Sequence, residues 1–207
     1  KAIQGLYAPG SIFKVVTAYA GLDLGVITQQ TESVCNGYFF IKGRGTPFKC
    51  WKEGGHGKVN LVNAIKGSCN VYFYNTGVGV GVDAIHKYAN LFGLGKITGV
   101  GLQTEKAGLI PSSKWKKSTF KEPWYMGETP SAAIGQGYIT TTPMQVINMI
   151  NIIANDGLWM PPSLFKEQEG LRPQQIPLKS EYLSLIREGM VAVVNSEGGT
   201  AKKVRFE

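Results

Sequence analysis

Apolar residues recur at helical spacing in several stretches of the chain, and residues that start or stop helices bound each stretch. The first run extends from Ile12 to Leu24 and follows Pro9 and Gly10, so a helix should begin near Ser11. Further helices are predicted over residues 60–67, 68–76, 82–92, 112–120, 142–156 and 183–194.

Strand signals are fewer and shorter. Residues 38–41 and 47–51 predict two short strands around a turn at Gly43–Gly45. A glycine-rich segment up to Gly108 should be a loop with one strand. Residues 123–138 predict an aromatic loop, broken by glycine and proline, of the kind that often lines a site. Many helices with few strands indicate an α+β domain.

The composition fits one domain or a large part of one, because 207 residues with 43% hydrophobic content can bury a substantial core. Residues 161–177 are expected to be a connector. No apolar run reaches the roughly 18 residues of a membrane span, and no signal peptide opens the chain. The net charge of +8 suits an anionic membrane or wall, and without a nucleic-acid-binding signature we expect no nucleic acid partner.

Candidate chemistry begins at Ser11. A serine at a helix start has its Oγ at the positive end of the helix, and Lys14 follows one turn later on the same face. Serine is a poor nucleophile unless a base removes its proton, and a lysine whose pKa is lowered by burial can be that base. Ser-x-x-Lys also occurs on solvated helix faces, so the motif alone is weak evidence for catalysis.

A second polar motif, Ser68-Cys69-Asn70, stands between two apolar helical stretches. Ser-x-Asn at such a junction points two polar side chains the same way from an apolar environment. The alternative is structural, with Ser68 as a helix N-cap and Asn70 as an incidental polar residue. Together, Ser-x-x-Lys and Ser-x-Asn are the first two motifs of the penicillin-interacting serine enzymes.

Longer stretches carry a more specific resemblance. Residues 5–11 resemble the active-site entry of class B penicillin-binding proteins, and residues 51–57, 123–129, 134–138 and 142–145 resemble the elongation-specific penicillin-binding protein 2 family. The match runs in order along the whole chain. It implies the penicillin-binding/β-lactamase-like transpeptidase fold, an antiparallel sheet with helices, with residues 1–207 as part of one transpeptidase domain.

The resemblance also implies an activity: a peptidoglycan D,D-transpeptidase of cell-wall elongation that cross-links stem peptides through a serine acyl-enzyme and is acylated by β-lactams. Ser11 would be the nucleophile and Lys14 its base. Ser68 would relay a proton to the leaving amine, and Asn70 would bind the substrate amide and fix the lysine. The implied substrate contacts are Gln136, Gly137 and Tyr138.

Partners and location follow from the same resemblance. A membrane glycosyltransferase and a rod-shape scaffold protein would be partners in the elongation complex. The protein would work at the periplasmic face of the inner membrane.

One departure from the family pattern is the missing third motif, Lys-[Ser/Thr]-Gly on an active-site strand. Gly198-Gly199-Thr200-Ala201 lacks the lysine and resembles the glycine-rich stretch that precedes that motif. We therefore expect a piece of a longer protein, without its N-terminal anchor, its pedestal and its C-terminal sheet strands. We expect this piece alone to be inactive.

A candidate metal site lies in the middle of the chain, where Cys35, Cys50, His56 and Cys69 gather. A Cys3His set is a complete tetrahedral zinc shell without an open position, so its role would be structural. The alternatives are a Cys35–Cys50 disulfide with Cys69 free, or three unpaired thiols. The odd number of cysteines and the glycines flanking His56 favour zinc, and relatives with acidic residues in place of Cys35 and Cys50 add weight to it.

Two rival functions stay open. A serine β-lactamase or β-lactam sensor shares the first two motifs, although the Gly-His-Gly and Gly-Gln-Gly contexts argue against it. A binding-only module of the elongation complex would keep a partner surface without activity. Labelling with a fluorescent penicillin separates these functions.

Overall fold

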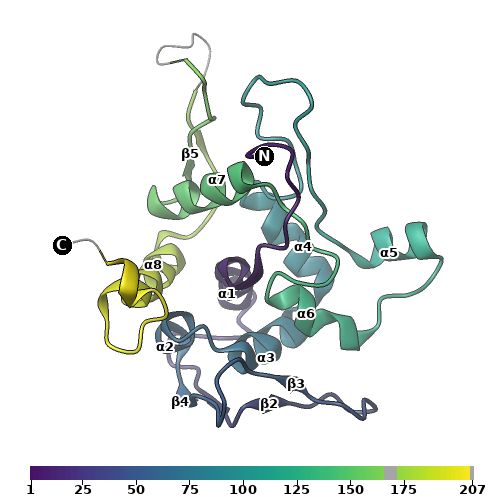
Figure 1. Cartoon of the computed structure of the whole chain (residues 1–207), viewed down its shortest axis with the longest axis vertical. Helices are drawn as coiled ribbons and strands as arrows, with labels where there is room; N and C mark the ends of the chain where they lie inside the picture. Colours follow the sequence, from purple (N-terminus) through teal and green to yellow (C-terminus); the bar gives the residue numbers. More distant parts are fainter. Residues whose placement is uncertain (166–171, 206–207) are drawn as a thin grey trace.

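Helix α1 (Lys14–Asp23) runs through the middle of the molecule and is seen end-on in Figure 1. The computed structural model describes residues 1–165 and 172–205. A 3-10 turn, η1 (Gly10–Phe13), leads into α1, and every residue from Lys14 to Leu22 is buried. A helix that is buried all round must be largely apolar, and α1 carries only Lys14 and Thr17 as buried polar side chains besides its tyrosine.

Further helices surround α1 (Figure 1). They are α2 (Leu61–Lys66), α3 (Asn70–Val80), α4 (Val82–Leu91), α6 (Thr129–Ala133), α7 (Pro143–Ala154) and α8 (Ser180–Asn195). Helices α3, α4 and α8 contact α1, and α2 packs along α8. Their apolar faces form one core, in which Phe13, Tyr19 and Phe73 are almost fully buried.

Local capping explains where two of these helices begin. The Asn60 side chain accepts a hydrogen bond from the backbone N–H of Asn63 at the start of α2. Thr142 and Gln145 form a reciprocal capping box at the start of α7, with Pro143 in the first helical position. Both predicted helix starts are confirmed.

The strands form three small antiparallel pairs within the described residues. The pairs are β1 (Ser33–Cys35) with β4 (Gly57–Val59), β2 (Tyr38–Phe39) with β3 (Phe48–Lys49), and β5 (Leu158–Trp159) with β6 (Gln174–Gln175). The predicted hairpin at residues 38–51 is confirmed with shorter strands. The strand predicted before Gly108 is not found among the described residues, and an isolated bridge pairs Leu109 with Thr140 just after that segment.

Some segments are more helical than their glycine and proline content predicts. Helix α3 continues past Thr76 to Val80 and packs on α6 at Gly77, where a Cβ would lie 2.2 Å from the Cβ of Ala133, so only glycine permits this contact. The predicted loop at residues 123–138 contains η2 (Met126–Glu128) and α6. Tertiary packing outweighs local propensity in both places.

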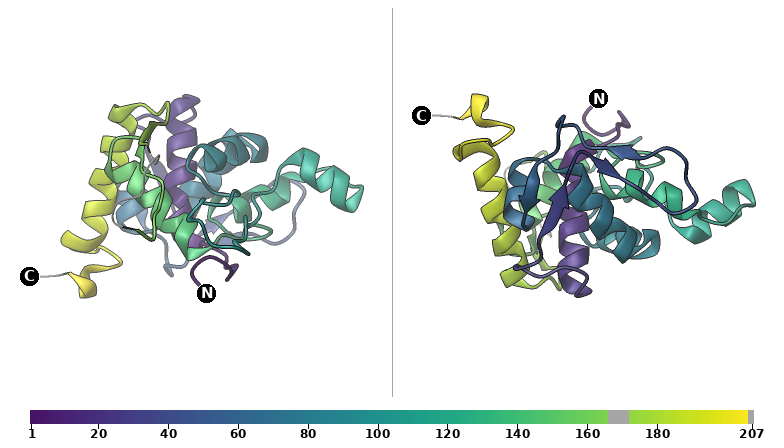
Figure 2. Two further views of the ribbon diagram at one scale, coloured as in Figure 1. Left: turned by 90° about the horizontal axis from the view of Figure 1, so that it is seen from above. Right: turned by 90° about the horizontal axis from the view of Figure 1, so that it is seen from below.

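The remaining elements lie at the periphery. Helix α5 (Ser113–Phe120) stands away from the body in both views of Figure 2, and η3 (Lys202–Val204) follows α8. The predicted connector at 161–177 includes residues 166–171, which lie outside the described residues. Throughout the described ranges, no helix combines the length and apolarity needed to cross a membrane.

Candidate active site

The turn that carries Ser11 packs against the segment that follows α6. Gly10 has a φ of 59°, and Ser11 lies exposed in η1, one turn before Lys14. The backbone N–H of Gly10 donates to the carbonyl oxygen of Gly135 at 2.9 Å. A Cβ on Gly135 would lie 2.5 Å from the Gly10 oxygen and from Phe13 Cβ, so only glycine permits this approach.

Lys14 lies below the turn with only 2% of its side chain exposed. Its Nζ donates to the Ser68 carbonyl oxygen at 2.8 Å, to Ser68 Oγ at 2.8 Å and to Asn70 Oδ1 at 2.7 Å. Burial lowers the pKa of Lys14 to about 8, against the opposing effect of the Cys50 and Cys69 sulfurs. A lysine with this pKa is partly neutral near neutral pH, and the neutral amine can accept a proton.

Ser68 connects Lys14 to Ser11. Its Oγ donates to Ser11 Oγ at 2.9 Å and accepts from Lys14 Nζ, so one hydroxyl bridges the other two groups. Ser68 has a φ of 52°, and it is Cys69 that occupies the N-cap position of α3, without a side-chain cap. Ser68 therefore does not cap α3, and Asn70 accepts a hydrogen bond from the buried Lys14. A serine in this conformation is strained, which is typical of functional sites.

Ser11 and Ser68 line a surface cleft of about 480 Å³. Its other lining residues are Trp51, Asn70, Ile134, Gln136 and Thr200. A second cavity of about 370 Å³, lined mainly by apolar side chains of α1, α7 and α8, shares Ser11, Ser68 and Thr200 with the first. A bound molecule in either cavity can therefore reach the Ser11 hydroxyl.

The three predicted substrate contacts lie in different surroundings. Gln136 lines the cleft, whereas Gly137 and Tyr138 are not among the described residues that line it. Tyr138 packs among aromatic rings, with ring centroids 5.1 Å from Trp115 and 5.6 Å from Phe120. Of the three, Gln136 is the one that lines the same cleft as Ser11 and Ser68.

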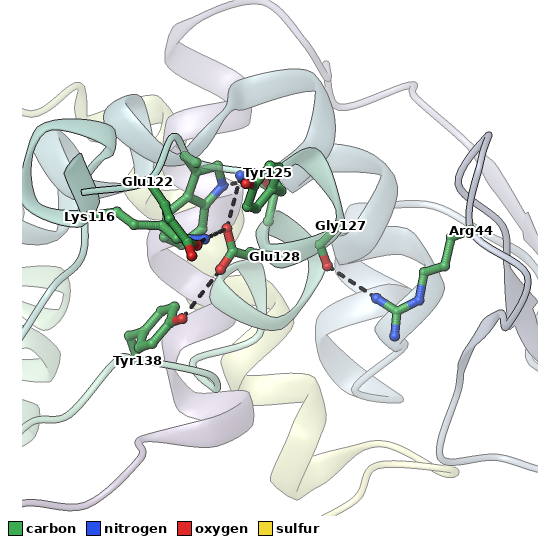
Figure 3. A network of polar contacts seen from close by, with 9 residues as sticks. Arg44, Lys116, Glu122, Tyr125, Gly127, Glu128 and Tyr138 are labelled. Atoms are coloured by element: carbon green, nitrogen blue, oxygen red, sulfur yellow. Dashed lines mark hydrogen bonds and ion pairs between the residues drawn. The ribbon is translucent and has the colours of Figure 1, made fainter. Parts of the chain in front are cut away.

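A polar network joins α5, η2 and the segment that follows α6 (Figure 3). Glu128 accepts hydrogen bonds from the Tyr138 hydroxyl at 3.4 Å and from the backbone N–H of Tyr125 at 2.9 Å, and it pairs with the buried Lys116. Burial acts to lower the pKa of Lys116, but the hydrogen bond and charge of Glu128 outweigh it, so the pKa is raised.

The η2 turn of this network is joined to the β2–β3 turn. Arg44 in that turn donates to the carbonyl oxygen of Gly127 at 3.3 Å (Figure 3), and its guanidinium lies over the ring of Phe48 at 4.1 Å. Two segments far apart in the sequence, the β2–β3 turn and η2, are thereby connected.

Two cleft residues were not singled out from the sequence. The sequence places Trp51 only at the end of the predicted 47–51 strand and at the start of the 51–57 stretch, whereas its side chain is 57% exposed beside Ser68. Thr200 belongs to the Gly-Gly-Thr stretch. The sequence relates this stretch only to the segment that precedes the third motif, and predicts no contact with the active site. The Thr200 backbone N–H donates to the carbonyl oxygen of Lys66 at 3.3 Å, which brings this stretch beside α2 and into the cleft.

The four predicted metal ligands come together next to the cleft. The sulfur atoms of Cys35, Cys50 and Cys69 and a ring nitrogen of His56 all lie within 4.8 Å of one another. His56 Nδ1 is 3.7 Å from Cys35 Sγ and 3.4 Å from Cys50 Sγ, and Nε2–H donates to the Gly67 carbonyl oxygen at 2.9 Å. That hydrogen bond directs the lone pair of Nδ1 toward the sulfurs, as in zinc sites.

Hydrogen bonds set the electrostatics of the cluster. Hydrogen bonding from the Cys69 thiol and from neighbouring backbone N–H groups lowers the pKa of Cys50, and burial opposes this effect. The same contact raises the pKa of Cys69. All three cysteines are buried and none forms a disulfide, which leaves the three sulfurs available to one metal ion.

Comparison with known proteins places this geometry in a family. The chain is 35% identical over 213 residues to the peptidoglycan D,D-transpeptidase MrdA of Escherichia coli K12, a match that covers 98% of this chain and 34% of that protein. The chain thus spans about a third of the length of the curated relatives that it matches.

Solved structures agree with that similarity. PBP2 of Pseudomonas aeruginosa, solved in complex with WCK 5153, is 36% identical with a TM-score of 0.91, over 98% of this chain and 48% of that one. PBP2 of Helicobacter pylori, solved in complex with MreC, is 32% identical with a TM-score of 0.90, over 98% and 38%. The predicted penicillin-binding transpeptidase fold, with helices and small antiparallel sheets, is confirmed. The family model described as penicillin-binding protein transpeptidase domain matches residues 1–207, and the chain belongs to this family.

Proposed function

We propose that the chain is part of a serine-type peptidoglycan D,D-transpeptidase of cell-wall elongation, with Ser11 as its nucleophile. The observation that carries this proposal is the contact chain from Ser11 Oγ through Ser68 Oγ to Lys14 Nζ, with steps of 2.9 Å and 2.8 Å. The similarity to MrdA supports the substrate class, a peptidoglycan stem peptide that ends in D-Ala-D-Ala.

In the first step, Ser11 Oγ attacks the carbonyl carbon of the bond between the two D-alanines. The Ser11 proton passes to Ser68, which gives its own proton to the neutral Nζ of Lys14. The C–N bond then breaks, and the leaving amine takes a proton back through Ser68. Ser11 now holds the peptide as an ester, and the terminal D-alanine departs.

In the second step, an amine of a neighbouring stem attacks the ester carbonyl carbon and gives up a proton to the same base. A new amide bond forms, the ester C–O bond breaks, and Ser11 Oγ is reprotonated. Asn70 would hold Lys14 and bind the substrate amide, while the backbone N–H of Ser11 would stabilise the negative charge on the carbonyl oxygen. Removing one such donor typically slows acyl transfer by ~10²–10³.

β-Lactams would acylate Ser11 as substrate mimics, because opening their ring forms the same ester. The Helicobacter pylori relative was solved with MreC. That complex supports a rod-shape scaffold protein of the same kind as a partner. From the family resemblance we also propose a membrane glycosyltransferase as a partner and the periplasmic face of the inner membrane as the location.

The cluster of Cys35, Cys50, His56 and Cys69 would hold one structural Zn²⁺. Bond lengths of about 2.3 Å to sulfur and about 2.0–2.1 Å to nitrogen place tetrahedral ligands roughly 3.6 Å apart. The separations of 3.7 Å and 3.4 Å between His56 Nδ1 and two of the sulfurs fit this geometry. Four protein ligands leave no position for a water, so the ion would stabilise the fold beside Ser68.

Labelling with a fluorescent penicillin tests the nucleophile. In the full-length protein, Ser11→Ala should abolish covalent labelling without changing the melting temperature by more than about 2 °C. Ser118→Ala, which removes an exposed hydroxyl on α5, is the matched control and should label like the wild type. Undiminished labelling of Ser11→Ala would refute the assignment, and rapid release of the label from the wild type would favour a β-lactamase.

A further inference from the structure

Trp51 combines an exposed indole ring with two hydrogen bonds to the backbone beside Ser68. Its Nε1–H donates to the Gly67 carbonyl oxygen at 3.0 Å and to the Ser68 carbonyl oxygen at 2.9 Å. Yet 57% of the side chain is exposed, and the ring lines the cleft with Ser11. An indole that stabilised the fold by hydrophobic burial would lie inside, so its hydrogen bonds are its main contribution.

The two carbonyl groups that Trp51 reaches are shared with other groups of the site. The Ser68 oxygen also accepts from Lys14 Nζ, and the Gly67 oxygen also accepts from His56 Nε2. The Trp51 and His56 rings meet edge to face, with centroids 5.5 Å apart. The indole therefore shares one backbone acceptor with Lys14 and the other with His56 of the cysteine–histidine cluster.

That backbone needs such support, because Ser68 has a φ of 52°, a conformation that a non-glycine residue adopts only when its surroundings impose it. Relaxation of this residue to an ordinary conformation would swing Ser68 Oγ away from its 2.9 Å contact with Ser11 Oγ. Donors that fix the carbonyl groups on either side of the Ser68 Cα keep its backbone dihedral angles in place.

We propose that Trp51 is a positioning residue for acyl transfer, whose indole N–H holds the Gly67–Ser68 backbone so that Ser68 Oγ stays between Ser11 and Lys14. This inference rests on the proposed function, in which Ser68 relays protons. The reaction would then need the indole N–H as a hydrogen-bond donor, and not the apolar surface of the ring. Loss of that donor slows acylation without weakening the initial binding of the acyl donor.

The test uses the full-length protein and resolves acylation by penicillin into a dissociation constant for the initial complex and a rate constant for ester formation. Trp51→Phe removes the donor and keeps an aromatic ring. A second variant carries benzothienylalanine at position 51, which replaces only the indole N–H by sulfur. Trp159→Phe in β5 controls for loss of an indole away from the cleft, and zinc content and melting temperature are measured for every protein.

We expect both Trp51 variants to lower the rate constant for ester formation about tenfold. Their dissociation constant and zinc content should stay within about twofold of the wild type. Trp159→Phe should match the wild type in all of these quantities. An unchanged rate constant in the benzothienylalanine variant would overturn the proposal. A raised dissociation constant with an unchanged rate constant would make the ring a substrate contact and would also overturn it. Failure of the wild type to be acylated would refute the proposed function itself, which separates the two failures.

Discussion

Lys14 Nζ lies 2.8 Å from Ser68 Oγ, although 54 residues separate the two in the chain. The contact joins the first residue of α1 to the junction between α2 and α3. It places the Lys14 amine, which water would keep charged, inside the protein. Desolvation disfavours the ammonium form, which is why the pKa of Lys14 falls to about 8. The lysine is thereby prepared to act as a base at a pH where an exposed lysine is almost fully protonated.

Acylation should therefore depend on pH in a defined direction. The neutral form of Lys14 increases as the pH rises through about 8, so the rate of penicillin acylation should rise and then level off above that value. The measurement is the acylation rate of the full-length protein from about pH 6 to about pH 10. Lys14→Arg keeps the positive charge but cannot release a proton in this range, so it should acylate at least ~10²-fold more slowly. A rate that does not change between pH 7 and pH 9 would exclude Lys14 as the base.

The cysteine cluster leads to a second prediction, which couples metal to both stability and acylation. His56→Ala should remove bound zinc and lower the melting temperature by about 5–10 °C, because metal binding contributes to folding free energy. Acylation should slow as well, because the Gly67 backbone beside Ser68 loses the His56 hydrogen bond. Elemental analysis, thermal unfolding and penicillin labelling measure the three effects.

His86→Ala is the matched control for the cluster. This histidine lies in α4, where its Nδ1 donates to the Ile110 carbonyl oxygen at 2.8 Å, outside the group of metal ligands. Its substitution should leave zinc content unchanged. Wild-type protein that is purified without chelator and contains no zinc, or that contains a Cys35–Cys50 disulfide, would contradict the metal site.

Local patterns predicted the features that depend on neighbouring residues. The starts of α2 and α7 follow from the side chains of Asn60 and Thr142, each of which accepts a hydrogen bond from the backbone N–H three residues on. The sequence also indicated that Cys35, Cys50, His56 and Cys69 could form one site, because few residue types bind zinc and these four are close in the chain. The proximity of their ligand atoms then comes from the β1–β4 pairing, in which Cys35 lies opposite Gly57.

Features that depend on contacts between distant segments cannot be predicted from local sequence patterns. A serine before a helix predicts a cap, and nothing local reveals that Ser68 adopts a φ of 52° and turns its hydroxyl toward Ser11. Tyr138 follows Gly137 in a predicted substrate segment, but its ring is drawn into the aromatic cluster with Trp115 of α5. In each case packing between segments far apart in sequence decides where the side chain points.

A final prediction concerns acid stability at the other end of α1. Asp23 accepts a hydrogen bond from the Tyr88 hydroxyl at 2.5 Å and pairs with Lys179 at 3.0 Å. The Tyr88 hydrogen bond is the main reason why the pKa of Asp23 lies below its ordinary value of 3.8, with Lys179 adding to the effect and burial opposing it. A carboxyl group with a lowered folded pKa contributes stability that is fully present above its unfolded pKa and is lost as the pH falls through the folded value.

Tyr88→Phe should reduce this contribution, because it removes the hydroxyl and keeps the ring that packs on Tyr19. At about pH 6 the variant should be less stable than the wild type by about 1 kcal/mol in urea unfolding, and the difference should shrink toward pH 3, where the wild-type carboxylate begins to protonate. Asp23→Asn should flatten the same part of the stability profile. A Tyr88→Phe deficit that is equally large at both pH values would mean that the hydroxyl acts through packing and not through the charge on Asp23.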